Sequence, residues 1–438
     1  MVRRGIIVLL APLLWAVACP ADDLSSSNFD FTATVDLPRL RSYTLANNPE
    51  IQAMEQRWRG AQARPSQEGS LPDPMINTAY HNESFERFTQ GSSDFAWLRF
   101  GAEQEVPFPG KLALREARAA READREGALY RATLLNVLTR LRIAYNDYYL
   151  AHKSIEIVRD NKALLEKLTR AAEARYEVGE GLQQDVARAH VELSILVGRL
   201  TSLEQARQSA MATLNAALNR PPAAPLGLPA PVEKRPLTYS LDQLESLAKE
   251  QSPTLQAADF GVVSSETNLD LAKRQYYPDF VLRADYFNKA ALVPEWEVGV
   301  GVRVPLYFWR KQAYGVREAA AGVGEARANR QSTSQDILAR LKDQYAQATS
   351  ADRLVELYGA VVRPQAEIAF ESASAAYQVG KVDFLSVLNS FTVLNDYRLR
   401  YYEELANFDK AVAQLQEAAG LLPEESVEDK TRGSHEHK

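Results

Sequence analysis

The sequence of 438 residues contains an internal duplication, and this feature limits the possible folds more than any other. Similar motifs recur in the same order at an offset of about 200 residues. The matched pairs are Ala46–Ala53 with Glu250–Ala257, Pro72-Asp73 with Pro278-Asp279, Val106–Phe108 with Val304–Leu306, and Tyr176–Gly179 with Tyr377–Gly380. Each element predicted in one half is therefore expected again in the other.

A proline-rich stretch separates the two copies. It contains six prolines between positions 221 and 236, a composition typical of an extended linker. The predicted organisation is a signal peptide at 1–18, an N-terminal extended segment at 19–36, a first repeat at 37–220, a linker at 221–239, a second repeat at 240–421 and a disordered polar tail at 422–438.

Each repeat is predicted to contain a first helix, two short strands, a very long helix, a glycine-containing turn and a last helix. The long helices, at about 111–178 and 311–378, would each extend roughly 100 Å at 1.5 Å per residue. The first helices (about 37–67 and 240–277) and the last helices (about 182–219 and 384–420) would stack end to end beside the long ones. The predicted shape is a tall wall of antiparallel helices.

Apolar residues in the first long helix recur at alternating steps of four and three from Tyr130 to Leu165, as in a coiled coil. A second stripe contains Leu135, Leu138, Tyr145 and Tyr149, which indicates contacts on two sides. Pro364 is expected to bend the second long helix, because proline removes a backbone donor and clashes with the preceding turn.

The predicted strands alternate apolar and polar residues, for example Trp296, Val298, Val300 and Val302 against Glu297, Gly299, Gly301 and Arg303. A half-buried soluble sheet gives the same pattern. A length of about 10 residues and an exported chain favour a transmembrane β-barrel instead. Four strands cannot close a barrel in lipid, so three chains would have to combine their strands into one barrel of twelve.

The N-terminus has the features of a secretory signal. Arg3 and Arg4 precede an apolar run from Gly5 to Ala18, which is too short to span a membrane. Cys19 follows directly and resembles the acylated cysteine of a bacterial lipoprotein, although Ala16 stands where lipoproteins usually carry Leu. Ordinary cleavage after Ala18, which would leave an incidental cysteine, is the alternative.

Composition excludes several classes of protein. The net charge of −6 argues against nucleic acid as a partner, and a mean hydropathy of −0.32 is too polar for a bundle of membrane helices. A single cysteine excludes a disulfide framework. No catalytic arrangement, metal site or cofactor motif stands out, so the chain is predicted not to be an enzyme.

The chain resembles the TolC family of outer membrane factors over nearly all of its mature length. The duplication, the four strands, the Glu105–Lys111 junction, Pro364–Glu367 and the two Tyr-x-Val-Gly turns carry this resemblance. It implies a mainly α fold with a small β part: a long antiparallel coiled-coil α-barrel plus a transmembrane β-barrel completed by trimerisation, with four strands per chain. The junction and Cys19 are closer to the heavy-metal branch of the CzcC and CusC type.

The resemblance also implies a role and partners. The expected role is the outer membrane exit duct of a tripartite efflux pump, with a periplasmic adaptor and an inner-membrane pump of the RND type as partners. The alternatives are the outer membrane component of a type I secretion system and a periplasmic coiled-coil structural protein without a pore, although the latter would not need the alternating strands.

The family's functional positions fall on both turns. The expected adaptor-docking tips are Tyr176, Val178, Gly179, Tyr377, Val379 and Gly380. The polar residues expected to narrow the duct are Asp185, Asp383, Ser386 and Asn389. Two of these, Ser386 and Asn389, stand where well-known members carry aspartate, so a less acidic aperture is expected.

Overall fold

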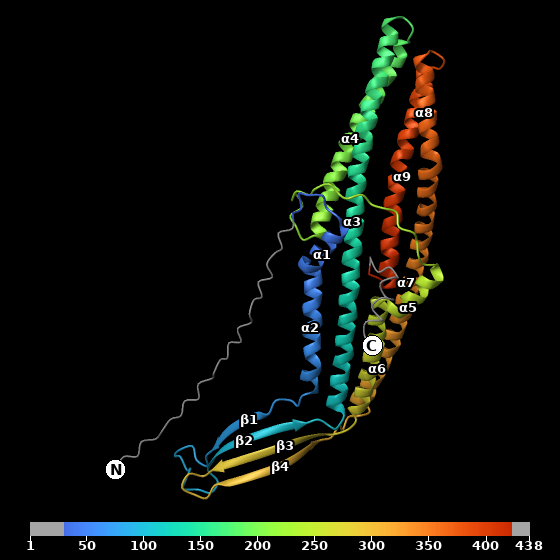
Figure 1. Ribbon diagram of the computed structural model, residues 1–438. Coiled ribbons are helices and arrows are strands. Elements are labelled where there is room, and N and C mark those ends of the chain that lie inside the picture. The colour runs from blue at the N-terminus through green and yellow to red at the C-terminus, as the bar shows by residue number, and fades with distance from the viewer. Residues whose placement is uncertain (1–29, 423–438) are drawn as a thin grey trace, which may run out of the picture.

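The computed structural model describes residues 30–422, which form two repeats of helices that share one sheet (Figure 1). The predicted signal peptide, Cys19 and most of the predicted tail lie outside this range. The first repeat contains α1 (Leu37–Asn47), α2 (Pro49–Gly69), β1 (Met75–His81), β2 (Trp97–Val106), α3 (Lys111–Glu177) and α4 (Gln183–Ala217). The second contains α5 (Leu241–Gln251), α6 (Pro253–Arg274), β3 (Asp279–Asn288), β4 (Glu295–Arg303), α7 (Lys311–Leu357), a π-helical turn (Tyr358–Val362), α8 (Arg363–Gln378) and α9 (Phe384–Ala419).

The first helix of each repeat is broken in two, which corrects the prediction of single helices at 37–67 and 240–277. Both breaks precede a proline, Pro49 or Pro253, that has no N–H to continue the earlier helix. At the first break, the Asn48 side chain accepts hydrogen bonds from the amides of Glu50 at 2.9 Å and Ile51 at 3.2 Å. The proline therefore starts a new helix that Asn48 caps.

The second long helix is interrupted where the sequence predicted a bend. The π-helical turn Tyr358–Val362 leads directly into α8, whose second residue is Pro364. A π turn changes the hydrogen-bond register of the helix, and this change accommodates the missing N–H of Pro364. Gly359 lies in this turn, and a Cβ there would approach the Tyr401 ring to 2.9 Å, so the residue must be small.

The helices form a wall whose lateral order is set by their contacts. Helix α3 packs against α2 and α4 on one side and against α6 and α9 on the other. Helix α7 packs against α6 and α9, and α8 packs against α9. The shorter helices therefore stack end to end beside the long ones, as predicted (Figure 1). Along α3, most residues of both predicted stripes are buried, including Leu138, Leu141, Tyr145 and Tyr148, whereas Tyr130 and Leu134 are half-buried.

The proline-rich linker lies in extended form across α3. The Tyr145 hydroxyl donates to the carbonyl of Ala230 at 2.8 Å, and the Tyr148 hydroxyl donates to that of Gly227 at 3.0 Å. The linker also pairs with the segment before α1, where the Val35 amide donates to the Leu228 carbonyl at 2.9 Å. A Cβ at Gly227 would lie only 1.8 Å from the Ala33 carbonyl oxygen, so this contact requires glycine.

The four strands form one antiparallel sheet in the order β1-β2-β3-β4. Its register places Val300 opposite Leu282 and Trp296 opposite Tyr286, which makes one face apolar. The other face carries ion pairs between Arg283 and Glu103 at 3.0 Å, Arg303 and Glu105 at 2.7 Å, and Arg99 and Asp285 at 3.6 Å. The predicted division into two faces is confirmed. Among residues 30–422, no helix has the length and apolar character needed to cross a membrane.

A buried ion pair joins the sheet to the helical wall and explains the Glu105–Lys111 motif. The Lys111 side chain, only 2% exposed, donates from Nζ to Asp279 Oδ1 at 2.8 Å and to the Tyr277 carbonyl at 2.9 Å. The Phe108 amide donates to the same carboxylate oxygen at 2.8 Å. The start of α3 is thereby fixed to the start of β3, so the two repeats share one junction.

Candidate functional site: the paired hairpin tips

The α3–α4 and α8–α9 turns form two tips at the end of the wall farthest from the sheet (Figure 1). Each turn contains a glycine with positive φ, +80° at Gly179 and +76° at Gly380. The Gly179 amide donates to the Tyr176 carbonyl and the Glu180 amide to that of Arg175, and the Gly380 and Lys381 amides make the equivalent bonds to Tyr377 and Ala376. Both tips are therefore Schellman motifs, in which glycine ends the helix and satisfies its last carbonyls.

The two tips differ in the residues after the shared glycine. In the first tip, a Cβ at Gly181 would lie 2.8 Å from the Tyr176 amide nitrogen, so this second glycine is required by close backbone approach. In the second tip, Asp383 occupies the N-cap of α9 and accepts from the Ser386 amide at 3.0 Å. The second glycine in the Gly179-Glu180-Gly181 sequence could have predicted the tighter turn, but the sequence analysis considered only Gly179.

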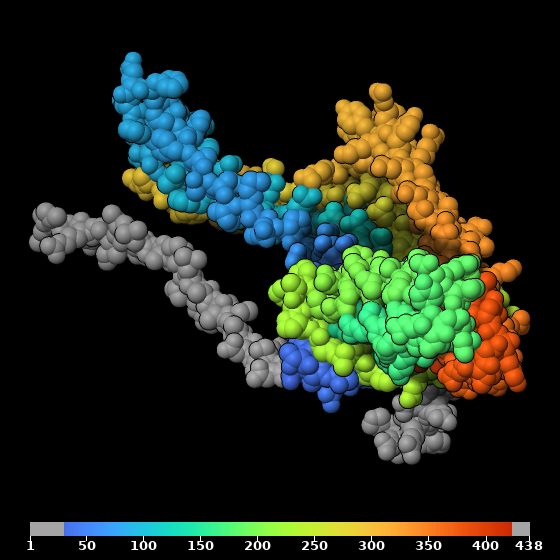
Figure 2. Space-filling model, turned by 90° about the horizontal axis from the view of Figure 1, so that it is seen from above, coloured from blue at the N-terminus to red at the C-terminus, as the bar shows by residue number. Residues whose placement is uncertain are grey.

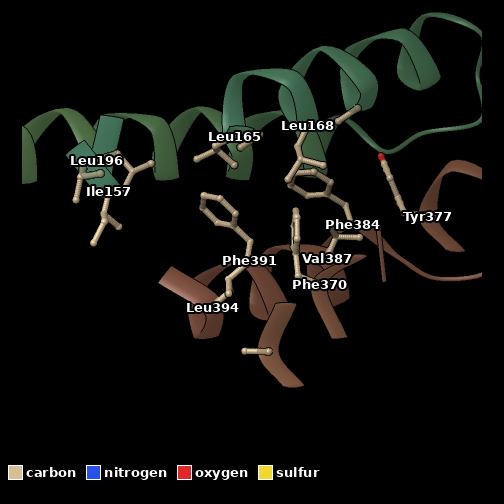
Figure 3. Close-up of a cluster of buried hydrophobic side chains, with 14 of the residues drawn as sticks. Ile157, Leu165, Leu168, Leu196, Phe370, Tyr377, Phe384, Val387, Phe391 and Leu394 are labelled. Carbon is tan, nitrogen blue, oxygen red and sulfur yellow. The ribbon is translucent and has the colours of Figure 1, made fainter. Parts of the chain in front are cut away.

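One hydrophobic cluster supports both tips. Residues from four helices meet in it, and Figure 3 shows Leu165 and Leu168 of α3 facing Phe384 and Phe391 of α9. Phe370 of α8 packs against Phe391 with ring centroids 6.0 Å apart. Because the helices below the turns share this core, the two tips form one structural unit and lie side by side when seen from above (Figure 2).

Arg175 links the two tips directly. Its guanidinium lies 5.0 Å from the centroid of the Tyr377 ring, and its Nη1 donates to the Tyr377 carbonyl. Tyr377 is only 4% exposed and packs against Phe384. Burial raises the pKa of its hydroxyl. The prediction grouped Tyr377 with the docking residues, but its ring lies in the core between the tips and is not available to a partner, whereas Tyr176 is exposed.

Exposed aliphatic side chains form the outermost surface of the tips. Val178 is 71% exposed, Val379 68% and Leu182 65%. Val178 and Val379 occupy the C-cap positions just before the two glycines, and Leu182 is the N-cap of α4. Exposed apolar groups gathered at one end of a coiled-coil unit are typical of a contact surface for another protein.

The predicted aperture residues lie just below the tips. The Ser386 hydroxyl donates to Asp383 Oδ1, and the hydrogen bonds from Ser386 hold the pKa of Asp383 below its usual range. Asp185 lies in the first turn of α4 and is partly exposed, and Asn389 is exposed on α9. Asp383 is thus a helix cap as well as a charged group, and Asn389 has no such structural role among the hydrogen bonds of the described residues.

No cluster of three or more His, Cys, Asp or Glu residues within 30–422 has a geometry that could hold a metal ion. The chemistry at the tips is that of shape, exposed apolar surface and a few fixed charges. Such a surface suits recognition of another protein.

Comparison with known proteins identifies related sequences over both repeats. The family model described as "Outer membrane efflux protein" matches residues 40–220 and 244–421, which cover most of both repeats. Two curated relatives are the outer membrane efflux protein BepC of Brucella suis, 23% identical over 262 residues, and the cobalt-zinc-cadmium resistance protein CzcC of Cupriavidus metallidurans, 24% identical over 366 residues. The first alignment covers 58% of this chain and 57% of BepC, and the second covers 80% of this chain and 81% of CzcC.

A solved structure has the same architecture. The outer membrane protein VceC of Vibrio cholerae superimposes with a TM-score of 0.76 at 19% identity, covering 89% of this chain and 97% of that protein. The predicted location in the outer membrane and the prediction that the chain is not an enzyme are confirmed, because the family consists of outer membrane channels. The predicted resemblance is also correct: the chain belongs to the outer membrane efflux protein family.

Proposed function

We propose that three copies of this chain form the outer membrane exit duct of a tripartite efflux pump, which conducts substrate passively from an inner-membrane transporter and its periplasmic adaptor. The main support for this proposal is that the sheet and the helical wall each have two open edges, and that these edges match. In the described residues, β1 and β4 each pair on one side only, so both edges of the sheet have free backbone groups. Such edges cannot remain unpaired in lipid, and a second copy would satisfy them.

The helical wall has open edges in the same lateral order. α2 and α4 of the first repeat form one edge and α7 and α8 of the second form the other, as β1 and β4 do in the sheet. One rotation can therefore place a neighbouring copy against both layers, head to tail. A repeated interface of this kind closes into a ring. Three copies would supply twelve strands, the number that the family resemblance implies.

The two wall edges carry uncharged stripes. Exposed residues without charge follow one side of α4, and a second set follows the π turn and α8. The stripes are Ala187, Val191, Ile195, Gly198, Ser202 and Gln205 on α4, and Val361, Gln365, Ile368, Ser372 and Ala375 on the other edge. Exposed stripes of small and apolar residues at coiled-coil spacing favour packing against another helix. We assign them to the contact between neighbouring copies.

Disulfide trapping tests this contact. Ile195 and Ile368 lie at similar depths below their tips, on opposite edges of one chain. The double substitution Ile195→Cys and Ile368→Cys should therefore give covalent trimers under oxidation, seen on non-reducing gels of outer membranes. The control is Ile195→Cys with Val393→Cys, because α9 lies within the wall at the same depth. Monomers only with the first pair, or equal ladders with both, would contradict the proposed ring.

The exposed surface of the tips supports the proposed partners. The exposed Val178, Leu182 and Val379 support end-on docking of a periplasmic adaptor, and an RND-type inner-membrane pump is the energy source in this proposal. Similarity to CzcC, a protein named for cobalt, zinc and cadmium resistance, makes metal cations the first cargo class to test. A type I secretion partner is the alternative, and co-purification of the adaptor with its pump distinguishes the two.

The aperture supplies a prediction about ion selectivity. Asn389→Asp, alone and with Ser386→Asp, should strengthen the cation selectivity of reconstituted channels, because rings of carboxylates select cations. The single variant is the cleaner one, since a carboxylate at 386 would also remove the hydroxyl that donates to Asp383. Reversal potentials at low salt, where screening is weakest, provide the measurement. Unchanged selectivity would show that Asn389 does not line the narrowest ring.

Acylation of Cys19 remains a proposal. The residue lies outside the described part of the chain, and its support is its position directly after the predicted signal peptide. Mass spectrometry of the mature N-terminus should show a cysteine carrying the added mass of acyl groups. A free thiol would reject the anchor, and Cys19→Ser would then leave the amount of protein in the outer membrane unchanged.

A further inference from the structure

The two repeats differ most at the connection between the sheet and the long helix. In the first repeat, this connection is short, with Pro107 and Lys111 buried and Phe108 stacked on Tyr277 at a centroid distance of 4.6 Å. In the second repeat, residues 304–310 join β4 to α7, and these residues and the first turns of α7 up to Arg317 are largely exposed. We call residues 304–317 the collar.

The collar combines aromatic and basic side chains and contains no acidic residue. Tyr307 is 69% exposed and Trp309 56%, and their rings lie 6.1 Å apart. Phe308 contacts Trp309 edge-on at 5.2 Å. The arrangement is ordered, because the amides of Arg310 and Lys311 both donate to the Tyr307 carbonyl, at 3.0 and 2.9 Å. The exposed rings are therefore held in place by the fold.

Three cations of the collar have no carboxylate partner. Arg310, Lys311 and Arg317 are at least partly exposed, and none of them forms an ion pair with a described residue. By contrast, the next arginines along α7, Arg327 and Arg330, each pair with an acid of α6 at 2.7 Å. A set of unpaired cations beside exposed aromatic rings is complementary to an anionic surface that has an apolar layer behind it.

The collar also continues the apolar face of the sheet. Val300 and Val302 lie on that face and Val304 follows in the same alternation, all of them exposed. This face would contact lipid in the proposed duct, so the collar would lie where the lipid ends and the periplasm begins. Tyrosine and tryptophan are enriched at such boundaries because their rings are apolar and their tips are polar.

We propose that the collar binds the headgroups of anionic phospholipids in the periplasmic leaflet of the outer membrane. Arg310, Lys311 and Arg317 contact the phosphates, and Tyr307 and Trp309 lie at the level of the glycerol backbone. This inference rests on the proposed duct function and adds a lipid class to it. The first repeat has no equivalent, so a trimer would carry three such sites, one for each collar.

Native mass spectrometry tests the proposal. Trimers would be released from bilayer nanodiscs of phosphatidylcholine mixed with phosphatidylglycerol, and the phosphatidylglycerol that each trimer retains would be counted. Arg310→Gln, Lys311→Gln and Arg317→Gln together should reduce this retention, by about fivefold for each neutralised charge. The matched control replaces Arg340, Lys342 and Arg353 with Gln, since these exposed cations lie farther along α7 and outside the collar.

A photoreactive phosphatidylglycerol provides the second measurement, and its adducts should map to residues 304–317. Equal retention by both triple variants, or adducts confined to other segments, would overturn the proposal. Loss of trimers in lipid-free detergent on Trp309→Ala would instead identify the collar as a contact with the neighbouring copy, and would also overturn it. Channel conductance measured in phosphatidylcholine alone separates failure of the duct function from failure of this lipid site.

Discussion

Aspartate at both Val178 and Val379 should abolish efflux while trimers remain at normal abundance. Both side chains are exposed at the ends of the two tips and contribute nothing to the core beneath them. Loss of their packing therefore costs the folded chain little, whereas six new carboxylates per trimer would have to be desolvated on docking. An unpaired charge buried in an interface costs several kcal/mol, enough to reduce adaptor binding by about a thousandfold.

The structure shows why the valines are better positions for this test than the glycines. Any side chain at Gly380 would adopt an unfavourable positive φ, and its Cβ would lie 3.3 Å from Arg175 Nη2. A substitution there would disturb the link between the tips, so lost efflux could reflect local unfolding. Val379 has neither constraint, and its substitution isolates the docking surface.

The measurement is substrate accumulation in cells, together with crosslinking of the adaptor to positions around the tips. Val293→Asp is the matched control, because Val293 is similarly exposed but lies between β3 and β4, at the opposite end of the molecule. Near-normal efflux in the Val178→Asp, Val379→Asp protein would remove the docking assignment. An equal defect in the control would point to a general effect of added charge.

The sequence predicted those parts of the fold that depend on local patterning. Strand alternation, the coiled-coil stripes and the glycines at positions 179 and 380 each reflect backbone geometry that a few neighbouring residues decide. The outer ends of the two predicted long helices, 111–178 and 311–378, therefore agree with the structure to within one residue. The breaks at Pro49 and Pro253 were missed because proline also fits the first turn of a helix, so its position alone does not show where one begins.

The differences between the repeats could not be read from sequence. Tyr176 and Tyr377 occupy equivalent positions in the two Tyr-x-Val-Gly motifs, yet one is exposed and the other is covered by Arg175 and Phe384. The covering residues come from the other repeat and from the next helix, so only the packing of one repeat on the other decides the outcome. Lys111 is a similar case, since its partner Asp279 lies in the other repeat.

Lysine at Val300 should prevent assembly of the outer membrane trimer, whereas lysine at the adjacent Gly299 should be tolerated. Val300 lies near the middle of β4 on the apolar face, opposite Leu282. A lysine facing lipid at this depth costs about 2–4 kcal/mol per chain, a factor of about 30 to 1,000 in the folding equilibrium. Each of the three chains would carry this cost, so only a small fraction of the heat-stable trimers should remain in outer membrane preparations.

Gly299 provides the control because a lysine introduced there would point to the opposite face of the same strand. A Cβ there meets nothing closer than the Arg283 Cβ at 4.0 Å, so there is room for a longer group. The added charge would lie opposite Arg283, which already pairs with Glu103 on the polar face. In water, a like-charge pair of this kind costs below about 1 kcal/mol. Equal loss of trimers in both variants would show that both faces are packed against protein, and equal tolerance would show that neither faces lipid.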